Sequence, residues 1–236
     1  LKLHVVQSSA SVQLLYLVGW SQLYSSAGCF TVAHRILSHA CELAHEKRLH
    51  SLILECKAYM AYCLLAGGSH ENAVALVDKA LLEHGKRSPF EAVQTAEVYR
   101  MLASVRLGRN LEGDLRALEK RISLLRRKAM QWHLATSLMT RAEALLSMQR
   151  GAEGEDSVRE AAEVSRKIRD RMLYWRSQYL LGRISEQGLR HEQALRRYRR
   201  AAHTAQEIAQ DIEEDRLRES FLGQPEVRDL LSRFDR

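Results

Sequence analysis

Proline, long apolar runs and closely paired cysteines are scarce or missing from this sequence. Only two of the 236 residues are proline, while 46% are hydrophobic and 28% are charged. This composition, rich in Ala, Leu, Glu and Arg, is typical of a folded, helical chain rather than a disordered one. The most apolar stretch, residues 12–24, is interrupted by Gln13, Gly19 and Gln22. Because a membrane span needs about 18 or more consecutive apolar residues, we expect a soluble protein.

The cysteines also lack the CxxC spacing of common metal and redox motifs. Cys56 and Cys63 are instead seven residues apart, which places them on one face of a helix. This spacing favours reduced, half-buried thiols in a reducing compartment, so we predict a cytoplasmic location. The sequence begins without an initiator Met or a signal-peptide pattern, from which we expect a fragment of a longer polypeptide.

Charge of one sign does not dominate the chain, although the formal net charge is +7. The 36 basic residues are accompanied by 29 acidic ones. The two basic clusters, residues 120–128 and 190–200, carry apolar residues at helical spacing. We therefore interpret both clusters as solvated helix faces and do not expect nucleic acid as a partner.

A repeat of about 40 residues fills most of the sequence. Its anchor positions are mostly small residues separated by 40, 41, 40 and 40 residues, and they are Ala33, Ala73, Asp114, Gly154 and Ala194. Each unit contains two helical patterns divided by a break rich in Gly or polar residues. We therefore predict about five helical hairpins, at residues 11–48, 51–87, 89–129, 130–170 and 171–207, followed by a C-terminal cap at residues 208–236.

Close helix packing explains the residue types at the anchors. Two helices approach to about 8 to 10 Å only where a Gly or Ala lies at their crossing and a larger side chain fills the adjacent space. We expect Gly182 and Ala194 to be spacers and Tyr198 to be the filler. In the third unit Asp114 replaces the small apolar residue.

This frame resembles the tetratricopeptide repeat family. The resemblance is carried by the pair Leu181 and Gly182 in a first helix and by Ala194, Tyr198 and Ala201 in a second, and it covers roughly residues 11–207. The proline that commonly ends a unit is absent, and the period exceeds the family's usual length of about 34 residues. The longer period resembles that of tetratricopeptide-like arrays in bacterial regulators.

The resemblance implies an all-α fold, a single right-handed α-α superhelix of antiparallel hairpins. The string LRESFLGQPEVRDLL, residues 217–231, resembles the end of repeat regions in large bacterial signalling proteins. Because one hairpin cannot bury its hydrophobic face alone, a terminal helix is expected to cover the last unit.

Motifs for catalysis or metal binding fail on spacing. In HEKRLH, His45 and His50 are five residues apart, whereas a zinc-protease helix needs histidines four apart. In HGKRS, residues 84–88, Ala80 stands where a phosphate loop would have its first glycine, and no strand precedes it. We therefore predict no enzyme activity, no catalytic residues, no metal and no cofactor.

The predicted binding surface is the groove lined by the first helices of the units, because these helices form the concave side of a right-handed stack. Its candidate residues are Gln22, Tyr59, Tyr62, Arg100, Ser104, Glu143, Tyr179 and Arg183. Aromatic and arginine side chains suit a protein or peptide ligand. For Tyr59 and Tyr62 a core role stays open as an alternative.

The sequence thus favours a protein–protein or peptide interaction scaffold within a larger regulatory or signalling protein. The partner would be another protein, or an effector domain of the same polypeptide. A small-molecule sensor of a bacterial transcriptional regulator or signalling ATPase is the alternative. No membrane contact is expected, and pairing of two copies through residues 1–9 stays open.

Overall fold

The computed structural model describes residues 10–234, and this part of the chain is helical with no strand. The chain packs as two compact units, Leu1–Ala103 and Ser104–Arg236, with the division inside α5. The first unit contains α1 (Ala10–Ser26), α2 (Phe30–Glu46), α3 (His50–Ala66), α4 (His70–His84), a short 3-10 helix η1 (Gly85–Arg87) and most of α5 (Phe90–Leu107). The second contains α6 (Leu111–Arg127), α7 (Gln131–Ser147), α8 (Gly151–Lys167), α9 (Arg171–Gln187), α10 (His191–Asp211), α11 (Asp215–Leu222) and α12 (Pro225–Ser232).

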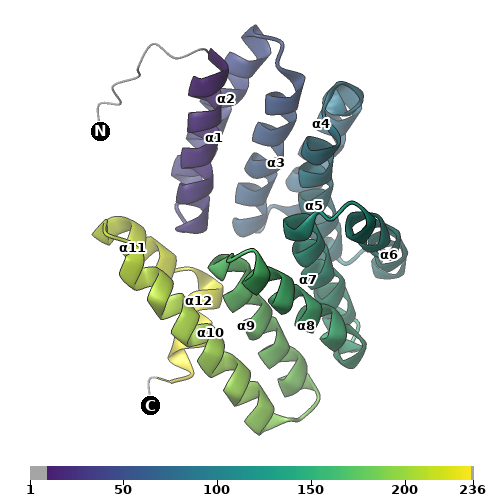
Figure 1. Ribbon diagram of the computed structural model, residues 1–236, viewed down its shortest axis with the longest axis vertical. Coiled ribbons are helices and arrows are strands. Elements are labelled where there is room, and N and C mark those ends of the chain that lie inside the picture. Colours follow the sequence, from purple (N-terminus) through teal and green to yellow (C-terminus); the bar gives the residue numbers. More distant parts are fainter. Residues whose placement is uncertain (1–9, 235–236) are drawn as a thin grey trace. The chain divides into compact units, whose positions relative to one another are not determined.

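Helices pack mainly on their neighbours in the chain (Figure 1). In the first unit α2 packs on α1 and α3, and α3 packs on α4. In the second, each helix from α6 to α10 packs on the next. First helices of successive pairs also touch, since α1 contacts α3 and α7 contacts α9. This sequential packing is consistent with a helical repeat.

The turns follow a period of about 20 residues, which is half of the repeat. In each of eight links one residue has a left-handed φ between 53° and 82°, and these residues are Gly28, Arg48, Gly68, Gly108, Ala129, Gln149, Arg169 and Leu189. In seven of these links the next amide bonds back to the helix that has just ended, as Arg190 N does to the Ser185 carbonyl at 2.8 Å. The link at residues 85–89 differs, because η1 and Pro89 replace the left-handed residue.

Small residues lie at the helix crossings, as the sequence predicts. A Cβ added to Gly182 of α9 would lie 2.6 Å from Cδ1 of Tyr198 on α10. A Cβ on Gly154 of α8 would lie 3.1 Å from Cα of Ala142 on α7. The expected roles of Gly182 as a spacer and Tyr198 as a filler are therefore confirmed.

The cysteines behave as small core residues. All four are free, and Cys41, Cys56 and Cys63 are buried. Burial raises the pKa of Cys56 to about 12, so its thiol stays protonated and unreactive at neutral pH. Among the described residues, no helix has both the length and the apolar character that a membrane crossing requires.

Candidate functional site

The predicted groove residues of the first unit gather around an aromatic cluster. Tyr59 and Tyr62 of α3 lie with ring centroids 5.7 and 5.3 Å from that of Tyr99 on α5, and the Phe30 ring is 6.1 Å from Tyr62. Tyr59 and Tyr62 are half-buried. Burial, followed by the nearby Glu55 carboxylate, raises the pKa of Tyr59 to about 12. These rings therefore contribute strongly to packing between α3 and α5.

The other two predicted groove residues of this unit, Gln22 and Arg100, each contact a side chain of the same unit. Gln22 of α1 is exposed and hydrogen-bonds to Tyr59. Arg100 of α5 donates from Nε to Oδ1 of Asp78 on α4 at 2.6 Å, and from Nη1 to Glu97 at 3.4 Å. The charge of Arg100 is thus partly neutralised within the unit.

Ser104, which the sequence placed in the groove, serves the contact between α5 and α6. Its hydroxyl donates to Oδ1 of Asp114 at 2.9 Å. Asp114 is buried in the slot that other units fill with Ala or Gly, and its Oδ2 has no hydrogen-bond partner among the described residues. Ser104 therefore compensates in part for a buried carboxylate at this crossing.

Glu143 and Tyr179 are engaged by other polar side chains of the second unit. Glu143 accepts from Nε of Arg106 at 3.3 Å, and the same guanidinium lies 3.8 Å from Glu226 of α12. The Tyr179 hydroxyl donates to Oδ2 of Asp229 at 2.8 Å. Burial and this neighbouring carboxylate raise the pKa of Tyr179 to about 12. Helix α12 thus covers part of the predicted surface.

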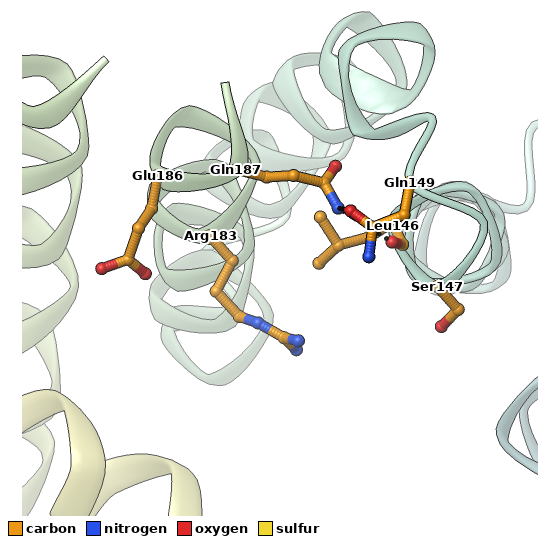
Figure 2. A pocket seen from close by; sticks show the side chains of 6 residues that line it. All are labelled: Leu146, Ser147, Gln149, Arg183, Glu186 and Gln187. Carbon is orange, nitrogen blue, oxygen red and sulfur yellow. Dashed lines mark hydrogen bonds between the residues drawn. The ribbon is translucent and has the colours of Figure 1, made fainter. Parts of the chain in front are cut away.

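Arg183 lines a cavity of about 420 Å³ between the C-terminal ends of α7 and α9 (Figure 2). The other lining residues are Leu146, Ser147, Gln149, Glu186 and Gln187. Figure 2 shows the Arg183 guanidinium extending away from the Glu186 carboxylate. Arg183 forms no hydrogen bond or ion pair with any described residue. Its donors are therefore open to a ligand.

The glutamine in the cavity wall is held by internal hydrogen bonds. Nε2 of Gln187 donates to the Leu146 carbonyl at 3.1 Å and to Oε1 of Gln149 at 2.8 Å. Oε1 of Gln187 accepts from the amide of Gly151 at 3.1 Å. These bonds join the end of α9 to the link between α7 and α8, so the wall around Arg183 is preorganised.

The glutamate in the wall is also fixed. Tyr198 donates to Oε2 of Glu186 at 2.8 Å, and Arg233 donates to Oε1 at 3.0 Å. Burial alone would raise the pKa of Glu186, but these two donors outweigh burial and lower it. Glu186 is therefore ionised and already paired, which leaves the positive charge of Arg183 unopposed in the cavity.

Two histidines that are distant in the sequence meet in the first unit. Nδ1 of His50 lies 3.0 Å from Nδ1 of His84, and the His45 ring centroid is 5.5 Å from that of His84. Because His84 is 34 residues from His50, sequence spacing carries no signal of this contact. Within residues 10–234 no group of three or more His, Cys, Asp or Glu side chains is arranged to hold a metal ion.

No protein-family model and no curated protein sequence matches this chain. The resemblance to tetratricopeptide repeats therefore stays a prediction from the residue pattern.

Proposed function

We propose that this chain is a non-catalytic interaction scaffold, built as a tetratricopeptide-like array of about five helical hairpins. In this proposal the first helices present a surface to a protein or peptide, within a larger regulatory protein of a reducing, cytoplasmic compartment. The turns at intervals of about 20 residues and the Gly and Ala crossings support the array. The free, mostly buried cysteines support the reducing compartment.

The observation that carries the proposal is the cavity at Arg183. An unpaired guanidinium offers five N–H donors in a planar fork, which suits a carboxylate or a peptide carbonyl. The apolar side chain of Leu146 and the hydroxyl of Ser147 lie in the same wall. This combination suits a peptide that places an acidic side chain on Arg183 and a neighbouring apolar group against Leu146.

The chemistry of the cavity favours binding over catalysis. A general acid or base works best with a pKa near the operating pH. The pKa of Glu186 is lowered by its two donors, and arginine stays charged at neutral pH. Neither charged group in the wall is therefore suited to proton transfer.

A small-molecule sensor is the second candidate, because about 420 Å³ falls within the usual size of small-molecule sites. The six lining residues include no aromatic ring on which a sugar could stack. Without a ring in the wall, a peptide is favoured over a sugar ligand.

Selection of random peptides displayed on phage tests the proposal against the second candidate. Peptides enriched on the wild-type chain are expected to contain an acidic residue and to bind at least tenfold more weakly to Arg183→Glu. The matched control is Arg199→Glu, which reverses an exposed arginine on α10 that has no partner among the described residues. Absence of enriched peptides, together with a thermal shift by a metabolite that Arg183→Glu abolishes, would support the sensor instead.

A further inference from the structure

Helix α12 binds the second unit through an apolar core. Val227 and Leu230 are both 0% exposed, and they lie in one hydrophobic cluster with Trp175 of α9 and Tyr198 of α10. In Figure 1 this short yellow helix runs beside α10. Two aliphatic side chains one turn apart therefore anchor α12 on a face made by two longer helices.

Charged contacts at the C-terminal end of α12 surround this core. The guanidinium carbon of Arg233 lies 4.3 Å from the Tyr198 ring centroid, and the same side chain donates to Glu186 of α9. Asp229 accepts from the hydroxyl of Tyr179, which is one of the predicted groove residues. The end of α12 thus presents a cation to a carboxylate and an aromatic face.

The N-terminal end of α12 makes a contact of the opposite polarity. Glu226 lies 3.8 Å from the guanidinium of Arg106, which belongs to the second unit. Glu226 and Val227 lie four and three residues before Leu230, and Arg233 lies three after it, so these contacting residues share one face of a helix. Negative charge at one end and positive charge at the other fix the direction in which a helix lies on this face.

We propose that the face formed by α9 and α10 is a helix-binding site, which α12 occupies within the chain and which a short amphipathic helix of a partner protein occupies in its place. The partner helix has the pattern of α12: an acidic residue beside an aliphatic one, the same pair again three residues later, and an arginine one turn further. This is the recognition of an amphipathic helix by a groove. The proposal rests on the proposed function and names the partner class for the surface next to Arg183.

The contacts of α12 are suited to exchange. The helix has eight residues, fewer than the roughly 12 to 15 that an isolated helix needs, so it is ordered by the face that it binds. Its ion pairs are partly exposed, with 30% of the Arg233 side chain and 47% of the Glu186 side chain accessible, and such pairs hold weakly. A link of only Gly223 and Gln224 joins it to α11.

A labelled synthetic peptide of residues 224–234, QPEVRDLLSRF, tests the site. It is titrated by fluorescence anisotropy into the wild-type chain and into a full chain carrying Val227→Ser and Leu230→Ser, which remove the two apolar anchors of α12. We expect at least tenfold tighter binding to the double variant, because a tethered α12 competes in the wild type at a millimolar effective concentration. A peptide with the same two substitutions is the matched control and should not bind.

The direction of docking has its own control. Adding Glu186→Arg to the double variant should weaken binding of the wild-type peptide, because the peptide's Arg233 then meets a like charge. A peptide carrying Arg233→Glu should restore binding to this triple variant. A folded double variant that binds no peptide would overturn the proposal, as would equal binding of both peptides.

If circular dichroism shows that the double variant is unfolded, hydrogen exchange of the wild-type chain decides. Amides of residues 229–232 should exchange at least tenfold faster than the protected amides of α9 and α10. If the amides of α9, α10 and residues 229–232 exchange at one common rate, α12 leaves its binding face only when the whole chain unfolds. That result would overturn the proposal. The phage selection at Arg183 can still succeed in that case, so failure of the helix site and failure of the interaction scaffold are distinguishable.

Discussion

Replacement of Gly182 by alanine tests the packing on which the whole array depends. The added Cβ would lie 2.6 Å from Cδ1 and 2.9 Å from Cζ of Tyr198. The ring has little room to move, because Tyr198 is 3% exposed, its hydroxyl bonds to Glu186 and Arg233 stacks on its face. Overpacking of this kind costs about 1 to 3 kcal/mol, whereas Gly to Ala within a helix gains about 1 kcal/mol. We therefore expect Gly182→Ala to lower the free energy of unfolding by about 1 kcal/mol.

The matched control is Gly19→Ala in α1, where an added Cβ has no atom within 4 Å. Without a clash, only the helix gain remains, and we expect a stabilisation of about 0.5 to 1 kcal/mol. Both variants are measured by urea denaturation followed by circular dichroism. In a Tyr198→Leu background the penalty of Gly182→Ala should shrink, because the ring is gone. Equal stabilisation by both alanines would refute the assigned crossing.

Three further predictions concern single contacts. Ser104→Ala should destabilise the chain by about 1 to 3 kcal/mol, because neither carboxylate oxygen of Asp114 then has a hydrogen-bond partner. In chemical denaturation, the double variant that also carries Asp114→Ala should recover most of this loss. Losses that add in the double variant would contradict the pairing. Burial, followed by Arg121, lowers the pKa of His133 to about 4 from 6.5, so its ring is neutral in the folded chain at pH 7. As the pH falls from 6.5 to 4, the unfolded chain binds a proton at this histidine that the folded chain does not bind, so the free energy of unfolding should fall by about 2 kcal/mol after allowance for partial solvent screening. Denaturation of His133→Leu measured over the same pH range should show a shallower fall. Parallel curves for the two proteins would argue against this assignment. Leu189 is 76% exposed with φ 57°, so Leu189→Gly should raise the free energy of unfolding by about 0.5 to 1 kcal/mol, and a loss of stability in thermal melts would count against the turn geometry.

The periodic features of the fold could be predicted from the sequence, because they depend on local residue patterns. Helix ends lie close to the predicted units, as α3 and α4 together span residues 50–84 against the predicted 51–87. Gly28 and Gly68 lie in predicted breaks and take the left-handed φ that glycine tolerates. The close contact of Gly182 with Tyr198 follows from the alternation of small and large residues.

Contacts between distant segments could not be predicted in the same way. The pairs Arg233 with Glu186 and Tyr179 with Asp229 are 47 and 50 residues apart, beyond any repeat period that the sequence displays. The repeat pattern also gave no sign that Ser104, a predicted groove residue, hydrogen-bonds to Asp114 of the adjoining helix. No feature of the repeat frame marks the division of the chain inside α5. For the candidate site, Arg183 was one of the predicted groove residues, but the repeat pattern gave no sign of the other residues that line the cavity with it.

Capture of partners from a lysate of the source cells tests the central claim most directly. Three versions of the chain serve as bait: wild type, Arg183→Glu and Arg199→Glu, each confirmed as folded by circular dichroism. Our account predicts a protein that wild type and Arg199→Glu retain and Arg183→Glu loses, because only that variant reverses the charge in the cavity. Identical captured sets from all three baits would contradict the assignment of the Arg183 surface as the binding site.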